Sequence, residues 1–230
     1  MSHRPLILHE DAHLLVVDKP AGLLTQGYSQ GEPTLERALR SHLLAEAPAS
    51  GYLGTVHRLD RPVSGVMVWA KTPKAARRLC EQFARRVARK QYWAVVEALP
   101  KDRAGIWDDW LCEEDTGLGV VQICLEIAPR ARHARTRYAL GTGPGLLLPP
   151  GCAWLKLWPE TGRTHQLRVQ ASSRGLPILG DSPYQSRRPF GPGIALHARS
   201  LSLQHPISRQ EMTFEAELPT AWAEQGIRIP

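Results

Sequence analysis

The apolar positions along the chain fall mainly in short runs, which predict a strand-rich fold. Residues 5–22 predict two short strands that are separated by a turn and end at a Lys19-Pro20 loop. A turn-rich loop is expected at residues 141–151. Further strand-like runs occupy residues 66–71, 90–99, 105–114, 118–127, 134–140, 152–158, 195–204 and 211–218.

Two segments in the first half of the chain repeat their apolar positions at helical spacing. Leucines at every fourth position predict a helix over residues 33–47. A second helix is expected after Thr72, which can cap it, with Pro73 in its first turn. Its predicted apolar stripe comprises Ala76, Leu79, Cys80, Phe83, Ala84 and Val87.

A third helix is predicted over residues 164–174, with Thr164 as its N-cap and Gly175 just past its end. Strands therefore outnumber helices, and they do not alternate regularly with them. This pattern favours the α+β class, with a largely antiparallel mixed sheet and flanking helices. A length of 230 residues fits one large domain or two small ones, and we expect residues 1–230 to form a single domain.

Composition favours a water-soluble protein without a metal centre. Hydrophobic residues make up 43% and charged residues 22% of the chain, as in ordinary globular domains. No apolar run approaches the roughly 20 residues that span a bilayer, and no signal-peptide pattern opens the sequence, so we expect a cytoplasmic location. The four cysteines form no C-x-x-C pair and suggest no zinc site, so we expect reduced, partly buried thiols, with Cys80 on the apolar face of the second helix.

Positive charge is concentrated in two stretches of the chain. The net charge is +7, and residues 70–90 hold eight basic residues against the single acid Glu81. Residues 129–137 add four arginines without an acid. Such concentration suggests a polyanionic partner such as nucleic acid, although a solvated basic face would give the same composition.

Three distant segments place reactive polar groups in turns beside apolar elements. They read "DKPAG" at 18–22, "HRLDRPVSG" at 57–65 and "TGRTHQLRVQ" at 161–170. Loops that carry function on a rigid scaffold have this character. In the second segment, Asp60 lies between Arg58 and Arg61, either as a surface ion pair or as a carboxylate kept ionised for chemistry. In the third, Arg163 and the unpaired N–H groups of the helix start would favour an anion.

These motifs resemble the RluA family of RNA pseudouridine synthases. "HRLDRPVSG" is similar to the family's segment around its catalytic aspartate, and "RKQYWAVVE" to its tyrosine-bearing strand. "TGRTHQLRV" with "GLPILGDSPY" is similar to its third motif, and "LHARSLSLQHPISRQEMTFEAELP" to its C-terminal strands. The likeness runs from about residue 6 to residue 219. It implies the family's catalytic fold with a basic RNA-binding cleft, and here without the S4 domain that many relatives carry.

The resemblance implies an isomerase that converts uridine in structured RNA to pseudouridine. The bond from C1′ to N1 breaks, the uracil turns, and C5 bonds to C1′. Nothing is oxidised or hydrolysed, so we expect neither cofactor nor metal. The partner would be a tRNA or rRNA stem-loop, since RNA target bases are commonly found in loops where they can splay out. We expect a monomer.

The resemblance also implies roles for three catalytic residues. Asp60 matches the catalytic aspartate, which would stabilise or attack the sugar or remove a proton from C2′. Arg168 matches the arginine that pairs with that carboxylate and keeps it ionised. Tyr92 matches the tyrosine whose ring would pack against the uracil and whose hydroxyl would assist loss of the C5 proton. An ordinary strand tyrosine is the alternative reading of Tyr92.

Five further residues are expected to bind RNA or shape the site. Arg58 would enter the base stack and fill the hole left by the flipped uridine, unless it simply pairs with Asp60. Leu167 would contact the flipped base, and Arg163 would face the anion. Lys19 would fix the first loop or touch phosphate. His57 is read as making a structural hydrogen bond rather than acid–base chemistry.

Three positions depart from the family pattern. Val63 stands where threonine is usual, "LLTQG" follows "KPAG" where Val-His-Pro is usual, and Gln170 replaces a histidine. They suggest a change in substrate choice more than in chemistry. Two other functions remain open, namely a catalytically silent RNA-binding protein on the same fold and a sugar hydrolase. The hydrolase would need a second carboxylate, for which Glu160 and Asp181 are weak candidates.

Overall fold

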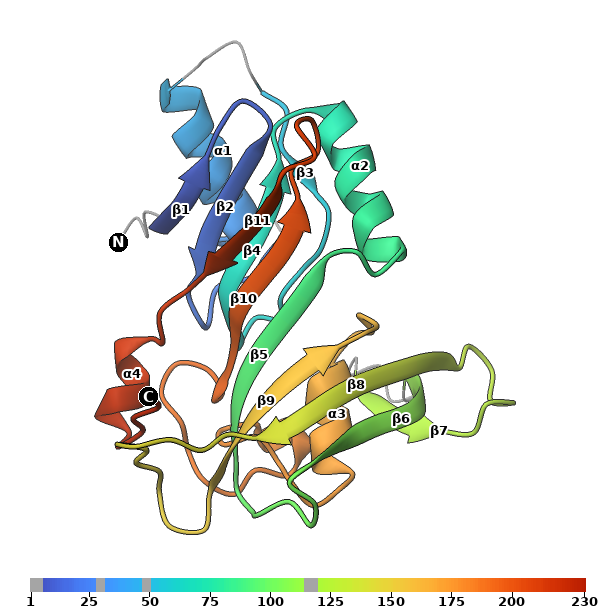
Figure 1. Ribbon diagram of the computed structural model, residues 1–230, viewed down its shortest axis with the longest axis vertical. Coiled ribbons are helices and arrows are strands. Elements are labelled where there is room, and N and C mark those ends of the chain that lie inside the picture. The colour runs from blue at the N-terminus through green and yellow to red at the C-terminus, as the bar shows by residue number, and fades with distance from the viewer. Residues whose placement is uncertain (1–5, 28–31, 47–50, 114–119) are drawn as a thin grey trace. The chain divides into compact units, whose positions relative to one another are not determined.

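The computed structural model describes residues 6–27, 32–46, 51–113 and 120–230, which form two compact units. The first unit comprises Met1–Lys90 and Ala198–Leu218, and the second comprises Gln91–His197 and Pro219–Pro230. Figure 1 shows their elements, which are mostly strands with a few short helices. The predicted α+β class is confirmed. Ala47, Glu114, Leu118 and Gly119, at the edges of predicted elements, lie outside the described residues.

The first unit is built on an antiparallel sheet. Its strands are β1 (Leu6–Glu10), β2 (Leu14–Lys19), β3 (Gly54–Thr55), β4 (Ser64–Ala70), most of β10 (Leu196–Gln204), and β11 (Glu211–Glu215). The order is β1-β2-β4-β10, while β3 pairs with β4 and β11 pairs with β10. The predicted hairpin of β1 and β2 is confirmed, and β2 places Lys19 opposite Gly65 at the start of β4. This pairing brings the first two motifs together.

Two helices belong to the first unit, α1 (Leu35–Glu46) and α2 (Pro73–Ala84). The three predicted leucines of α1 are buried, and Thr72 caps α2 by accepting the N–H of Ala75. The apolar face of α2 differs from the prediction, because Ala75 and Leu79 are its buried residues. Cys80 is exposed, so the prediction that it lies on the buried face is wrong.

The second unit holds a five-stranded sheet in the order β5-β9-β8-β6-β7. Its strands are β5 (Arg89–Val96), β6 (Ala104–Glu113), β7 (Val121–Cys124), β8 (Arg132–Leu140) and β9 (Ala153–Pro159). The pairs β5–β9, β9–β8, β8–β6 and β6–β7 are all antiparallel. Helix α3 (Gln166–Ser172) packs on one face of this sheet, where Val169 joins a core with Leu111 and Ala134. A 3-10 turn, η1 (Ser182–Tyr184), and helix α4 (Thr220–Glu224) complete the unit.

Helix α3 begins one residue later than predicted. Its N-cap is His165, in the left-handed conformation with φ of 51°, rather than Thr164. Gln166 satisfies the start of the helix, because its Oε1 accepts the Arg163 N–H at 3.0 Å and the Thr161 hydroxyl at 2.7 Å. The helix ends at Ser172, two residues before the predicted Arg174, and Gly175 follows three residues later with φ of 68°. The Arg163 N–H, which belongs to the expected anion site, is therefore bonded to the protein's own Gln166 side chain.

No helix in the described part of the chain is long and apolar enough to cross a membrane. The prediction of one domain over residues 1–230 concerns how the two units fold together, and it stays a prediction.

Candidate active site

Asp60 lies in a tight turn just before strand β4. The Val63 N–H donates to the Asp60 carbonyl at 3.1 Å, and the flanking Leu59 and Val63 are buried. Gly65 ends the motif with φ of 116°, and a Cβ there would come within 2.3 Å of the Ala198 carbonyl oxygen. The strand can therefore start at this point only with glycine. The apolar anchors on both sides hold the half-buried Asp60 in a defined place.

Lys19 is the buried cation beside this aspartate. Its side chain is fully buried, and Nζ donates to the carbonyls of Pro20 at 2.9 Å, Leu23 at 2.7 Å and Arg61 at 3.2 Å. Burial lowers the pKa of Lys19 to about 7, and the nearby carboxylates of Asp60 and Asp18 oppose that shift. All three ammonium protons have carbonyl acceptors, so Lys19 fixes the first-motif loop and does not reach a phosphate.

Hydrogen bonds to backbone carbonyls tie the first-motif loop to the Asp60 turn. The Gly22 N–H donates to the Arg61 carbonyl at 2.8 Å, and Arg61 Nε donates back to the Gly22 carbonyl at 3.1 Å. The Thr25 hydroxyl donates to the Leu59 carbonyl at 2.7 Å. The two segments, about 40 residues apart in sequence, therefore form one rigid support for Asp60.

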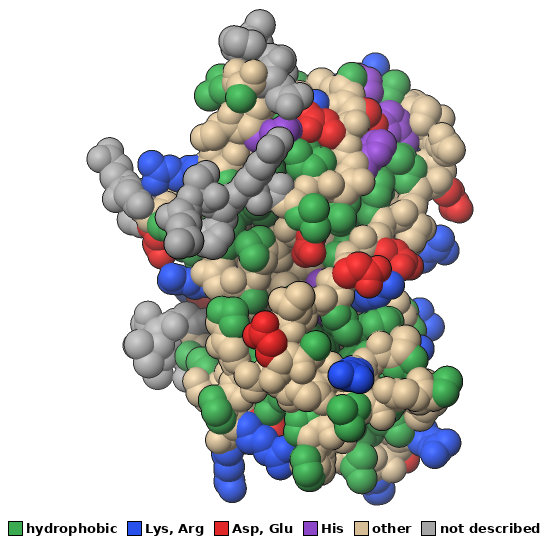
Figure 2. Space-filling view, turned by 90° about the vertical axis from the view of Figure 1, so that its left-hand side faces the viewer, with side chains coloured by type: hydrophobic (Ala, Val, Ile, Leu, Met, Phe, Trp, Pro, Cys, Tyr) green, Lys and Arg blue, Asp and Glu red, His purple; other side chains and the backbone are tan. Residues whose placement is uncertain are grey.

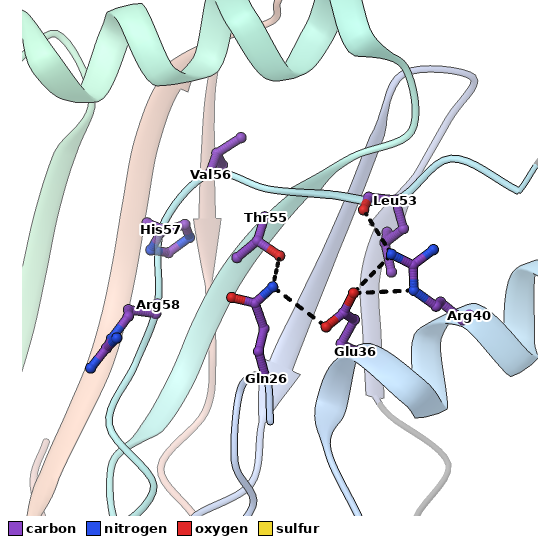
Figure 3. A pocket seen from close by; sticks show the side chains of 8 residues that line it. All are labelled: Gln26, Glu36, Arg40, Leu53, Thr55, Val56, His57 and Arg58. Atoms are coloured by element: carbon purple, nitrogen blue, oxygen red, sulfur yellow. Dashed lines mark hydrogen bonds and ion pairs between the residues drawn. The ribbon is translucent and has the colours of Figure 1, made fainter. Parts of the chain in front are cut away.

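Within the described residues, neither arginine that flanks Asp60 in sequence forms an ion pair with it. Arg61 Nη1 contacts Glu32 at 3.2 Å. Arg58 is exposed and has no hydrogen bond or ion pair within the described ranges. The alternative that Arg58 simply pairs with Asp60 is therefore wrong. Figure 3 shows the Arg58 guanidinium extending away from the neighbouring polar cluster of Gln26, Glu36 and Arg40.

His57, next to Arg58, holds the segment against strand β4. The Val68 N–H donates to His57 Nε2 at 3.0 Å, and the imidazole stacks on Phe83 with ring centroids 4.8 Å apart. Burial, together with the nearby Lys90 charge, lowers the pKa of His57 to about 3. The ring is therefore neutral at pH 7, and the expected structural hydrogen bond is present.

Arg168 lies buried in α3 and pairs with Asp181. Its Nε donates to Asp181 Oδ2 at 2.8 Å and its Nη2 donates to Oδ1 at 2.7 Å, while Asp181 is fully buried. The guanidinium also lies over the Tyr184 ring, 4.7 Å from its centroid. A guanidinium has five N–H donors, so this bidentate pair leaves donors for a second carboxylate.

Asp181 and Tyr184 hold Arg168 in place, a supporting role that the sequence analysis assigned to neither residue. Tyr184 accepts the Val121 N–H at 3.0 Å, and its hydroxyl lies 2.8 Å from His165 Nδ1. Together they fix the position of the Arg168 guanidinium. Both residues lie in "GLPILGDSPY", which resembles the family's third motif, and the sequence suggested for Asp181 only a weak claim as the second carboxylate of a hydrolase.

Tyr92 lies on β5 opposite Leu157 and is 9% exposed. Its neighbour Trp93 contacts Trp154 with ring centroids 4.9 Å apart, as expected for a residue that points to the other side of the sheet. Leu167 is buried in α3. Arg163 is exposed, and its Nε donates to the His133 carbonyl at 2.9 Å.

Gln170 is a packing residue rather than a substrate contact. It is fully buried in α3, accepts the Thr136 hydroxyl at 2.7 Å, and donates to Asp109 Oδ2 at 2.7 Å. It also donates to the Ala134 carbonyl at 3.2 Å. The departure from the family's histidine at this position therefore changes how α3 joins β6 and β8. Val63 is likewise buried, so this departure too lies in the core.

Asp60 belongs to the first unit, whereas Tyr92 and Arg168 belong to the second. The pairing of Arg168 with Asp60 therefore stays a prediction. In the part of the chain that the structure describes, no group of three or more His, Cys, Asp or Glu residues could hold a metal ion.

Basic residues are spread out rather than gathered on the face in Figure 2. Among the residues drawn in colour there, Lys and Arg side chains lie scattered between acidic and apolar ones. The cluster on β8 is partly neutralised, because Arg135 pairs with Asp108 at 2.7 Å and with Glu160 at 3.2 Å. Arg77 and Arg85 on and after α2 are exposed, while Arg78 donates to the Pro206 carbonyl at 2.6 Å.

Comparisons with known proteins all match this chain to RNA pseudouridine synthases. The family model described as RNA pseudouridylate synthase matches residues 13–173. The dual-specificity RNA pseudouridine synthase RluA of Escherichia coli K12 is 36% identical, over 92% of this chain and 92% of its own. An uncharacterized RNA pseudouridine synthase of Synechocystis is 35% identical over 93% of this chain, which spans 65% of that longer relative.

A solved structure supports the same assignment. The human RNA pseudouridylate synthase domain containing 4 protein is 27% identical and has a TM-score of 0.75, covering 98% of this chain and 94% of that one. This chain therefore belongs to the RNA pseudouridylate synthase family, within its RluA group. It is an RNA pseudouridine synthase, an isomerase whose partner is RNA.

Proposed function

We propose that Asp60 is the essential group that acts on the target uridine, at C1′ or C2′ of its sugar. The observation that carries this proposal is the support of Asp60. The aspartate lies in a turn that Lys19 and the first-motif loop fix, and neither flanking arginine has a contact with it in the described structure. A carboxylate held in this way is suited to stabilise or attack a sugar that gains positive charge as the C1′–N1 bond breaks.

The remaining roles follow from the chemistry of each side chain. Arg168 pairs with Asp60 and keeps it ionised, and the rigid Asp181–Arg168 pair supports this role by fixing the guanidinium. Tyr92 packs against the uracil. Arg58 enters the base stack when the uridine flips out, and its exposure and lack of a described partner support this role. Leu167 and Arg163 contact the base and the RNA backbone.

The substrate is a stem-loop of tRNA or rRNA, and the enzyme acts as a cytoplasmic monomer without cofactor or metal. Its two units form one catalytic domain, with the RNA bound in a basic cleft. These statements extend the family assignment, which by itself identifies RNA as the partner.

A pseudouridine map of cellular RNA, made with and without this gene, tests the proposal. Specific pseudouridines should be missing without the gene and should return when purified protein is added to that RNA. Free uracil in place of pseudouridine would indicate the hydrolase. RNA binding without any new pseudouridine would indicate the silent RNA-binding protein.

A further inference from the structure

A pocket of about 490 Å³ opens next to Arg58, entirely within the first unit. The described residues that line it come from the loop after β2, from α1, and from β3 with its flanking segments. They are Gln26, Glu36, Arg40, Leu53, Thr55, Val56, His57 and Arg58 (Figure 3). Its volume is within the range of small-ligand sites. Most of its lining side chains are polar, so it suits a polar occupant.

One part of the pocket supplies hydrogen-bond donors. Because His57 Nε2 accepts the Val68 N–H, the proton of its neutral ring lies on Nδ1, which remains a donor. Arg58 adds a guanidinium that has no partner within the described ranges. The Thr55 hydroxyl accepts from Gln26 Nε2 at 2.7 Å and can still donate its own proton.

Two side chains near Thr55, Gln26 and Glu36, supply acceptors. Glu36 Oε1 accepts from Arg40 at 3.1 Å and 2.8 Å, whereas Glu36 Oε2 accepts from the Gln26 amide at 3.4 Å. Since Gln26 Nε2 is the donating atom in both of its bonds, Gln26 Oε1 is an acceptor that no described residue uses. Two acceptor oxygens thus lie at one end of the pocket and the Arg58 guanidinium lies at the other (Figure 3).

We propose that this pocket binds a second nucleotide of the RNA, next to the target uridine, whose base carries an exocyclic amino group. The inference rests on the proposed function, which places Arg58 in the RNA stack beside the pocket. Proteins read RNA sequence mainly from unstacked bases, through hydrogen bonds on their edges. The Gln26 and Glu36 oxygens suit an amino group of adenine, cytosine or guanine. Uracil has no amino group to offer them, and the Glu36 carboxylate disfavours a phosphate at that end.

A cycle that combines protein and RNA changes tests the proposal. The RNA probe is a synthetic stem-loop around a mapped target uridine, made intact or with an abasic residue at one flanking position. On intact RNA, Gln26→Ala should lower kcat/KM for pseudouridine formation by roughly 5- to 150-fold. On the RNA whose abasic residue removes the pocket's occupant, Gln26→Ala should change kcat/KM by less than about twofold. Arg37→Gln, on the same helix but outside the pocket lining, is the matched control and should resemble wild type on every RNA.

Glu36→Gln keeps the size of the side chain and provides a second variant if Gln26→Ala folds poorly. Equal losses on intact and abasic RNAs for both variants, or no loss on any RNA, would overturn the role of the pocket. Wild-type turnover on intact RNA is measured in the same assay. Its absence would contradict the proposed function, whereas normal turnover with additive losses would contradict the pocket proposal alone.

Discussion

Replacing Lys19 with methionine removes the buried cation that joins the first-motif loop to the Asp60 turn. Methionine keeps the length and apolar packing of the side chain but donates no hydrogen bond. Three carbonyls, those of Pro20, Leu23 and Arg61, lose their donor. Leaving buried acceptors unpaired should lower the free energy of unfolding by a few kcal/mol. Pseudouridine formation should fall as well, because the turn that carries Asp60 loses its support.

The pKa of Lys19 makes this loss depend on pH. Burial lowers it from an ordinary value of 10.5 to about 7 in the folded protein. Between these two values the unfolded chain binds one proton more than the folded chain, so the free energy of unfolding rises with pH. The slope approaches about 1.4 kcal/mol per pH unit, with an upper limit of about 4–5 kcal/mol over the whole window. Lys19→Met lacks this contribution, so its deficit relative to wild type should grow as pH rises from 7 to 9.5.

Urea unfolding at half-unit pH steps, followed by tryptophan fluorescence, measures this difference. Lys74→Met is the matched control, because Lys74 is an exposed lysine on α2 and its replacement removes a charge without opening the core. The deficit of the control should stay constant over the same pH range. A deficit of Lys19→Met that does not change between pH 7 and 9.5 would refute the reasoning about the buried ammonium.

Three further predictions concern Arg168, the basic helix and the two units. Arg168→Ala should lower activity most at low pH, because Asp60 is then easier to protonate. It should also lower the free energy of unfolding by about 3–5 kcal/mol, because Asp181 stays buried without this guanidinium. A pH–rate profile of unchanged shape would argue against the pairing of Arg168 with Asp60. Changing Arg77, Arg78 and Arg85 together to Gln should weaken RNA binding and reduce its salt slope by roughly three, with little change in turnover at saturating RNA. A variant that keeps Arg78, which bonds to Pro206, separates RNA contact from folding, and an unchanged salt slope would show that this helix does not face the RNA. The two units should unfold in one transition, and fluorescence and circular dichroism curves that fail to coincide would contradict the single domain.

Local sequence signals predicted most of the fold. The β1–β2 hairpin and the Thr72 cap follow from side chains that act on their own neighbours. Two details of the helices differ from the predictions, although the features that set them are also local. Helix α2 stops at Ala84 and the chain turns at Arg86, with φ of 59°, so Val87 leaves the predicted stripe. The start of α3 is fixed by the Gln166 side chain, which a search for Ser or Thr caps does not find.

In the candidate site too, the sequence predicted some residues but not the contacts that hold them in place. Motif likeness predicted roles for Asp60, Tyr92 and Arg168, but it did not predict the groups that hold Asp60 and Arg168 in place. Asp181 pairs with Arg168 across 13 positions of sequence, and Lys19 bonds to the Arg61 carbonyl across 42. Both contacts arise only when the strands are assembled. Short β3 and α4 were also missed, because two and five residues carry too little periodicity to identify an element.

Asp60→Asn tests the central claim most directly. The substitution keeps the size of the side chain and removes the charge, while the contacts of Lys19 with backbone carbonyls remain available. Pseudouridine formation on a mapped stem-loop should become undetectable, while the dissociation constant for that RNA changes by no more than a few fold. Turnover within tenfold of wild type would contradict the account, because the carboxylate of Asp60 would then not be the essential group.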